Sequence, residues 1–148
     1  MALKERLAEE TKDALRSGEK VRLTTLRLLS AAVKNKEVEV GHELDDEEFV
    51  QVAQKEAKQR RESIEAFGKG GREDLVARER EELEVLNAYV PAGLSDEELD
   101  AIVNETVTAV GATGPGDMGA VMGAVMAKVK GRADGREVQA KVRARLGA

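Results

Sequence analysis

Apolar residues recur every three or four positions along almost the whole chain, the spacing that places them on one face of an α-helix. No short run alternates apolar and polar positions, so the pattern predicts no strand. Glycine, proline and aspartate interrupt the periodic stretches at points typical of helix ends. The pattern therefore predicts an all-α protein whose helices carry their apolar faces within residues 3–15, 21–33, 49–67, 75–90, 99–110, 118–129 and 138–146.

The segment Pro91-Ala92-Gly93 is the clearest break in this pattern. Proline has no backbone N–H to donate, and it disfavours the helical conformation of the residue before it. The apolar pattern restarts at Ser95, which stands three residues before Glu98, the spacing of a capping box. We therefore expect an N-terminal helical domain over residues 1–91 and a small C-terminal three-helix bundle over residues 94–148.

The predicted helix over residues 118–129 follows Asp117, a residue type that commonly caps helices. Gly119 and Gly123 are four positions apart, a spacing that lets a second helix approach closely. We expect this glycine face to pack inside the bundle. The apolar stripe of the same helix includes three methionines that we expect to fill the core: Met118, Met122 and Met126.

The net charge of −5 is unevenly distributed. Residues 128–148 hold seven cations and two anions, whereas acidic runs concentrate at residues 43–48 and 96–100. A basic end on an acidic body can orient a protein on a phosphate backbone. Because helix dipoles also favour cations near helix C-termini, charge alone leaves both interpretations open.

Composition excludes several classes of chemistry. The chain contains no cysteine, so thiolate metal sites, cysteine nucleophiles and disulfides are excluded. The only histidine, His42, has no second ligand at helical spacing, and no serine lies in a nucleophile elbow. Residues 114–119 match GxGxxG, but the residues before them are predicted helical, so a dinucleotide-binding motif is rejected. We expect no catalytic residue, no metal site and no cofactor.

The first fifteen residues are too charged for a secretory signal, and no apolar run approaches the roughly 20 residues needed to span a bilayer. These observations predict a cytoplasmic protein without a membrane partner.

A second basic run reads KEAKQRR over residues 55–61. Lys58 and Arg61 share one helix face, and interleaved glutamates favour an exposed, ion-paired surface over the alternative of a nucleic-acid contact. Arg60 falls instead on the apolar stripe, where it could reach a buried or interfacial carboxylate.

Several segments resemble the GatB/YqeY family, and in particular its free-standing YqeY-like proteins. The most specific is DMGAVMGAVMAKVKGRADG at residues 117–135, where Ala120 departs from the lysine that such proteins often carry. The resemblance covers nearly the full chain. Its other segments are TLRLL (25–29), KEAKQRRESIEAF (55–67), REDL (72–75), and YVP at 89–91 followed by Leu94-Ser95.

This resemblance implies an all-helical two-domain fold whose C-terminal domain is similar to the tail of the B subunit of tRNA-dependent amidotransferases. Those enzymes convert misacylated Glu-tRNA(Gln) or Asp-tRNA(Asn) to the amide form, and the tail helps to bind tRNA. The chain has no counterpart of the B subunit's catalytic cradle or of the glutaminase Ser–cis-Ser–Lys site. Related proteins are nevertheless described as glutamine-dependent carbon–nitrogen ligases, a label that extends to this chain by resemblance.

Resemblance and charge together predict a tRNA-associated accessory protein. With only two Phe, one Tyr and no Trp for base stacking, recognition would be of shape and backbone. One alternative is a component that joins an amidotransferase or aminoacyl-tRNA synthetase partner, and another is a protein-binding adaptor that uses the methionine stripe. The predicted tRNA-binding residues are Lys128, Lys130, Gly131, Arg132, Arg136, Lys141, Arg143 and Arg145.

Overall fold

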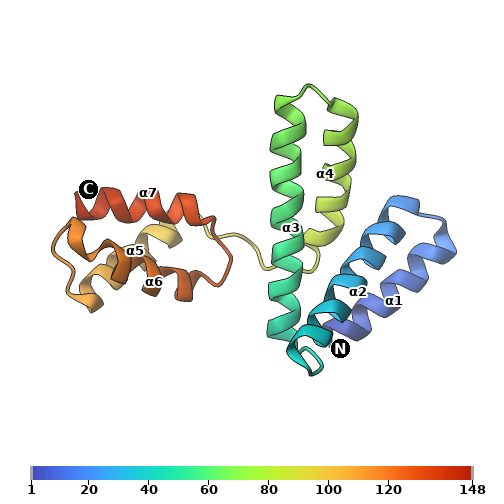
Figure 1. Ribbon diagram of the computed structural model, residues 1–148, viewed down its shortest axis with the longest axis horizontal. Coiled ribbons are helices and arrows are strands. Elements are labelled where there is room, and N and C mark those ends of the chain that lie inside the picture. The colour runs from blue at the N-terminus through green and yellow to red at the C-terminus, as the bar shows by residue number, and fades with distance from the viewer. Residues whose placement is uncertain (1, 148) are drawn as a thin grey trace. The chain divides into compact units, whose positions relative to one another are not determined.

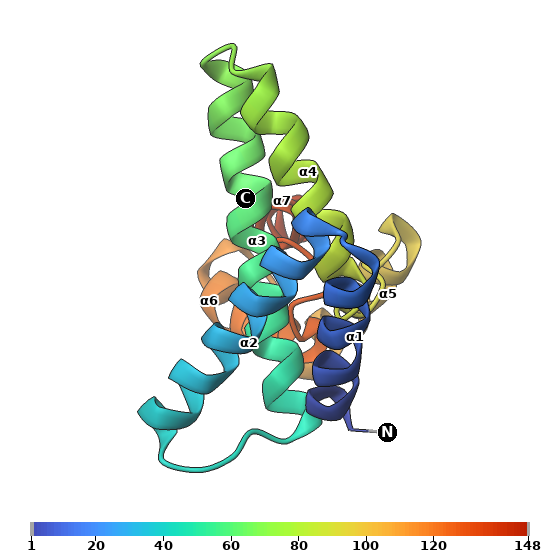
Figure 2. The same cartoon turned by 90° about the vertical axis from the view of Figure 1, so that its right-hand side faces the viewer.

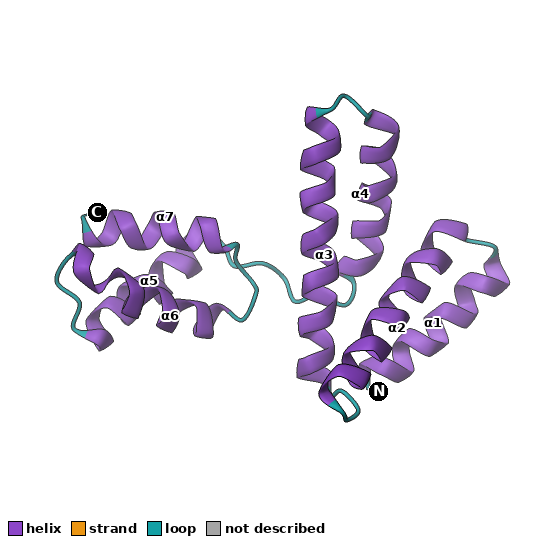
Figure 3. Ribbon diagram, in the orientation of Figure 1, coloured by secondary structure: helices purple, strands orange, loops and turns teal. Residues whose placement is uncertain are grey.

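A computed structural model describes residues 2–147, and over those residues the regular structure is helical without any strand (Figures 1 and 3). The predicted all-α class is confirmed. The chain divides into two compact units, Met1–Pro91 and Ala92–Ala148, each with its own core. The elements are α1 (Leu3–Ser17), α2 (Lys20–Val40), α3 (Asp46–Lys69), α4 (Glu73–Asn87), α5 (Asp96–Val110), the short 3₁₀ helix η1 (Pro115–Asp117), α6 (Met118–Val129) and α7 (Gly135–Leu146).

Helix boundaries in the N-terminal unit follow local signals. α1 and α2 end at Gly18 and Gly41, whose φ angles of 72° and 79° lie in the left-handed region that glycine adopts most readily. α3 begins with a capping box in which the Asp45 carboxylate accepts from the Glu48 N–H at 2.8 Å. In return, the Glu48 carboxylate accepts from the Asp45 N–H at 3.2 Å.

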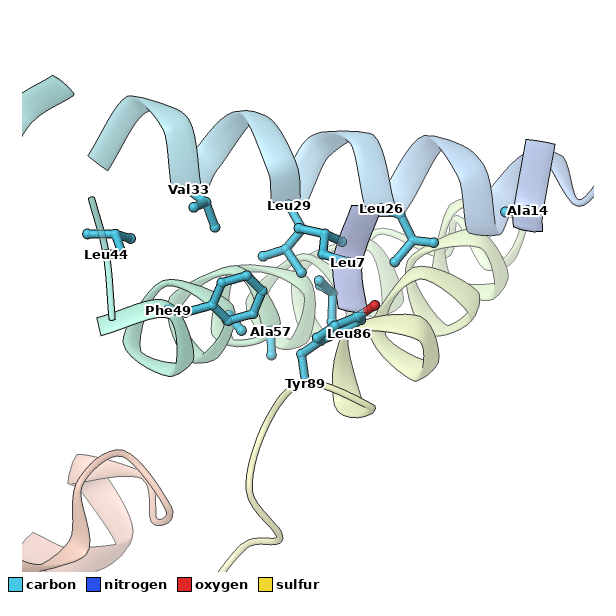
Figure 4. Close-up of a cluster of buried hydrophobic side chains, with 11 residues drawn as sticks. Leu7, Ala14, Leu26, Leu29, Val33, Leu44, Phe49, Ala57, Leu86 and Tyr89 are labelled. Atoms are coloured by element: carbon cyan, nitrogen blue, oxygen red, sulfur yellow. The ribbon is translucent and has the colours of Figure 1, made fainter. Parts of the chain in front are cut away.

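The N-terminal core lies where α1 and α2 meet the hairpin of α3 and α4 (Figure 4). The Phe49 ring of α3 is fully enclosed, and its centroid lies 5.8 Å from that of Tyr89, just after α4. α2 supplies three of the enclosing side chains. The buried apolar residues of this unit's cluster are Leu7, Ala14, Leu26, Leu29, Val33, Leu44, Phe49, Ala53, Ala57, Leu86 and Tyr89.

Tyr89 ties the end of the N-terminal unit to α1. Its hydroxyl donates a hydrogen bond to the Glu10 carboxylate, and the Arg6 guanidinium lies 4.6 Å from the tyrosine ring centroid. Arg6 Nε also donates to Glu10 Oε1 at 2.8 Å. Burial and the hydrogen bond to Glu10 raise the pKa of the Tyr89 hydroxyl, so it remains a donor at neutral pH.

Arg60 points inward from α3 toward three carboxylates, as its place on the apolar stripe predicts. Its side chain is 14% exposed, and its Nε lies 3.1 Å from Glu82 and 3.6 Å from Glu79, both on α4. Glu56, one turn earlier on α3, approaches to 3.7 Å. Arg60 is therefore a mostly buried cation beside three carboxylates, one of which also lies 3.9 Å from the exposed Arg78 guanidinium. Burial and the neighbouring Glu82 charge raise the pKa of Glu79.

Replacing Glu79 by glutamine should stabilise the N-terminal unit at neutral pH by up to about 1 kcal/mol, because it removes a carboxylate that is more costly folded than unfolded. Since the folded-state pKa of Glu79 is raised, the ionised group lowers stability, and protonation relieves that cost as pH falls through the raised pKa. The advantage of Glu79→Gln should therefore shrink under acid conditions. Urea unfolding at several pH values measures the difference in unfolding free energy between the variant and the parent protein. The control is Glu81→Gln, because Glu81 is exposed. An advantage that grows on acidification would contradict the assignment.

The C-terminal unit encloses a core composed largely of valine. Ser95 caps α5 by accepting from the Glu98 N–H at 3.1 Å, and Asp134 caps α7 by accepting from the Arg136 N–H at 2.7 Å. Asp117 does not cap α6 as expected: its carboxylate accepts from the Thr113 N–H at 2.9 Å in the preceding loop. The buried cluster comprises Leu99, Val103, Val107, Val121, Val125, Val129, Val138, Val142 and Leu146.

The prediction that the glycine face of α6 packs inside the bundle is wrong. Gly119 and Gly123 are exposed, and a Cβ built at either position has no neighbour within 4 Å beyond the helix's own nearby backbone. The helix turns its valines inward instead, because they bury more apolar surface than glycine does. Met126 is 37% exposed, so only Met118 and Met122 pack against the core.

Candidate nucleic-acid interface

The predicted tRNA-binding residues come from the end of α6, the turn after it, and α7. The turn contains two successive residues with positive φ, Lys130 at 48° and Gly131 at 77°. Glycine suits the second position because it adopts the left-handed conformation without a Cβ clash. Both residues are exposed, so the turn presents a cation and an open stretch of backbone to solvent.

Lys128 and Arg132 make contacts within the unit. Lys128 Nζ donates to Oγ1 of Thr106 on α5 at 3.0 Å. Arg132 Nε donates to the carbonyl of Ala92 at 2.9 Å, and the Arg132 carbonyl accepts from the Leu94 N–H at 2.9 Å. Arg132 thus fastens the segment before α5 to the turn between α6 and α7.

Lys141 and Arg145 lie on the side of α7 that faces α5. Lys141 Nζ lies 2.8 Å from Asp100 and 3.6 Å from Asp96, and the hydrogen bond to Asp100 raises the pKa of the Lys141 ammonium. Arg145 Nε donates to Asn104 Oδ1 at 2.9 Å. Most of the residues that make these contacts line a groove between α5 and α7. Their polar groups are therefore paired with one another.

Arg136 and Arg143 lie on the solvent side of α7, since seven residues correspond to almost two helical turns. Both side chains are exposed. Arg136 lies 3.7 Å from the Asp134 carboxylate, whereas the Arg143 side chain forms no hydrogen bond or ion pair within the described part of the chain. The predicted residues therefore separate into a group engaged with α5 or the preceding segment and an outward group that includes Lys130, Arg136 and Arg143.

The charge asymmetry of the sequence is partly balanced inside the C-terminal unit. Residues 92–148 contain seven cations, all after residue 127, and eight carboxylates, six of them before it. Three of those carboxylates, Asp96, Glu97 and Glu98, occupy the first turn of α5, where the helix dipole favours negative charge. Because α5 packs beside α7, Lys141 is paired with carboxylates of α5, whereas Lys130, Arg136 and Arg143 are exposed.

Other chemistry is hard to place on this chain. Within residues 2–147, no group of three or more histidine, aspartate or glutamate side chains is arranged to hold a metal ion. The His42 ring lies in the loop between α2 and α3, with Nδ1 2.9 Å from the Glu43 carbonyl oxygen and Nε2 3.7 Å from the Glu48 carboxylate. No helix in the described part of the chain has the length and apolar character needed to cross a bilayer.

A second cationic segment is absent from the sequence-based prediction of the site. Residues 20–36 hold five cations and no carboxylate. Counting charge in a sliding window would have found it, whereas the net charge of the whole chain and the C-terminal resemblance both point elsewhere.

The sequence matches a known protein family and several named proteins. A family model described as "Yqey-like protein" matches residues 4–146. Proteins named "Altered inheritance of mitochondria protein 41, mitochondrial" are similar: that of Lachancea thermotolerans is 35% identical over 74% of this chain and 60% of its own length. The Eremothecium gossypii protein is 37% identical over 72% of the chain and 62% of its own length. The matched region thus spans about three fifths of these relatives.

The cytoplasmic location predicted from the sequence is contradicted by these relatives, which are named as mitochondrial proteins. The prediction rested on the lack of a secretory signal and of a spanning segment. Neither feature distinguishes the cytoplasm from mitochondria.

Proposed function

The chain belongs to the YqeY-like family, and from that premise we propose that it is a tRNA-associated accessory protein whose C-terminal unit binds the tRNA backbone. The observation that carries the proposal is the outward pair Arg136 and Arg143 on α7, close in sequence to the exposed Lys130 turn. Arginine and lysine on an exposed helix face are the groups that contact phosphates without reading sequence.

The proposal includes a division of labour between two domains, 1–91 and 94–148, the second similar to the tail of the amidotransferase B subunit. Without aromatic side chains in the C-terminal unit, contacts would be made to phosphates and to helical shape rather than to stacked bases. We assign this chain a binding role, and the ligase label of related proteins to complexes in which a partner supplies the reacting groups.

Changing Arg136 and Arg143 together to glutamine should weaken binding of unfractionated tRNA by roughly tenfold or more at about 50 mM salt. If Lys130, Arg136 and Arg143 neutralise about three phosphates, these contacts should contribute about −2 to −3 to the slope of the logarithm of the association constant against log salt. Fluorescence anisotropy with labelled tRNA measures both quantities.

The matched control changes Lys12 and Arg16 of α1, two exposed cations that pair with neighbouring carboxylates, to glutamine. It alters the net charge equally and should leave affinity almost unchanged. The proposal fails if the parent protein shows no binding at low salt, or if the control loses as much affinity as the α7 variant.

A second candidate function, a protein-binding adaptor, is favoured by the uncovered side of α6. Gly119, Gly123 and Met126 form an uncharged exposed strip on that helix. Capture of a protein partner that survives nuclease treatment and is lost in Gly123→Glu would favour the adaptor. Partner capture that disappears with nuclease would favour the tRNA proposal instead.

A further inference from the structure

α2 begins with the longest stretch of the chain in which cations occur without carboxylates. Five cations fall between Glu19 and Glu37 in a protein whose carboxylates outnumber its cations by 29 to 24. Lys20 occupies the first turn of the helix, where the dipole disfavours positive charge, and that turn holds no acidic residue. Helix stability therefore does not explain this distribution.

Two of the five cations are used inside the unit. Arg22 lies 3.1 Å from Glu19 and 3.7 Å from Glu10, and Lys36 lies 3.4 Å from Glu39. These pairs anchor the flanks of α2. The other three cations form the set that we call the α2 row: Lys20, Arg27 and Lys34.

The members of the α2 row are seven residues apart, so they project from nearly the same side of the helix at intervals of about 10 Å. All three are exposed, and none of their side chains forms a hydrogen bond or ion pair within residues 2–147. The opposite side of α2 carries Leu29 and Val33, which point into the core (Figure 4). The turned view shows one long side of α2 clear of the other helices of its unit (Figure 2).

Several other cations on the surface of this unit are neutralised locally, whereas the exposed Lys55, Lys58 and Arg61 of α3 are interleaved with carboxylates along the helix. Lys12 pairs with Glu9, Arg16 with Asp13, and Lys69 with Glu65. Between the members of the α2 row lie Thr24 and Ala31 instead, which carry no charge. The row is therefore a straight strip of about 20 Å with three positive charges and no counter-charge on the same side.

We propose that the α2 row is a second RNA-binding surface, on the N-terminal unit, that contacts successive phosphates of an RNA backbone. A regular line of cations matches a polymer whose negative charge repeats along its length. A protein partner would need a large apolar or aromatic anchor at the centre of its contact, and between its cations the strip holds threonine and alanine. The exposed apolar residues of α2, Leu28 and Val38, lie beside the strip and beyond its end. The surface lies on a different unit from Arg136 and Arg143, so it stands whether or not those residues bind tRNA.

Changing Lys20, Arg27 and Lys34 together to glutamine in the full chain should weaken binding of a labelled 20-nucleotide single-stranded RNA and of unfractionated tRNA. We expect a loss of about tenfold or more at about 50 mM salt, and a salt slope shallower by about 2 to 3. The matched control changes Lys55, Lys58 and Arg61, exposed cations of α3, to glutamine. Circular dichroism and urea unfolding verify that both triple variants fold, which is expected since all six side chains are exposed.

Parental affinity in the α2 variant, or an equal loss in the α3 control, overturns the proposal. So does binding of the parent to anionic phosphatidylserine vesicles, lost in the α2 variant, when neither RNA probe binds. The same measurements on Arg136→Gln/Arg143→Gln separate the two surfaces. If that variant binds like the parent while the α2 variant does not, the C-terminal site fails and the α2 row stands.

Discussion

Replacing Arg60 by alanine should lower the free energy of unfolding of the N-terminal unit by about 2–4 kcal/mol. The substitution leaves Glu56, Glu79 and Glu82 facing one another without the guanidinium that lies within 4 Å of each. Glu82 is the most costly of the three, because its side chain is only 9% exposed and cannot recover full hydration. The loss exceeds that of a surface ion pair, which contributes at most about 1 kcal/mol.

Urea unfolding followed by circular dichroism measures this loss, with Arg61→Ala as the control. Arg61 is the next residue on α3 and is exposed, so its removal should change stability by less than about 0.5 kcal/mol. Adding Glu79→Gln and Glu82→Gln to Arg60→Ala should restore part of the stability, since two of the three uncompensated charges are then gone. Equal effects of Arg60→Ala and Arg61→Ala would show that the cluster contributes nothing.

Replacing Leu99 by alanine should destabilise the C-terminal unit by about 2–5 kcal/mol. Leu99 of α5 is fully buried among the valines of α6 and α7, and truncation leaves a cavity in addition to the lost transfer free energy. A unit of this size has a total stability of a few kcal/mol. We therefore expect α5, α6 and α7 to lose most of their structure near physiological temperature.

Amide hydrogen exchange resolves this effect by segment. Protection should fall across α5–α7 in Leu99→Ala and persist in α1–α4, because the two cores are separate clusters. Val110→Ala on the same helix is the control, since Val110 is 43% exposed and its truncation removes little buried surface. Loss of protection in both units, or in neither, would contradict the prediction.

Much of the fold could be predicted from local signals. The spacing of apolar residues identified each α-helix, and the helix ends fell at residues whose chemistry stops or starts a helix, such as Gly18 and Asp45. The inward direction of Arg60 also followed from periodicity alone, because a helix fixes which residues share a face. α2 continues to Val40, past the end of its apolar face at Val33, because no helix breaker occurs before Gly41.

The candidate site could be predicted only as a set of residues. From the sequence alone, the cations after residue 127 form one group because they are close in the chain. In a helix, however, the side chains of neighbouring residues project from different sides. Lys141 reaches Asp100 while Arg143, two positions later, faces solvent. The partner of each cation depends on how α5 packs beside α7, which no local pattern specifies. The prediction that the glycines of α6 pack inside the bundle failed for the same reason. The spacing of two residues shows that they share a helix face, but it does not show that another helix covers that face.

The sequence by itself determined the helical class and most of the core face of the helices, because both depend on the spacing of side chains along one backbone. The tertiary structure alone decided which charges are neutralised between helices, because those ion pairs form between side chains that packing brings within 4 Å. Lys141 and Lys34 are both lysines on amphipathic helices, yet one is held by two aspartates and the other is exposed without a partner in the described chain. That difference separates a structural cation from one that can bind a ligand.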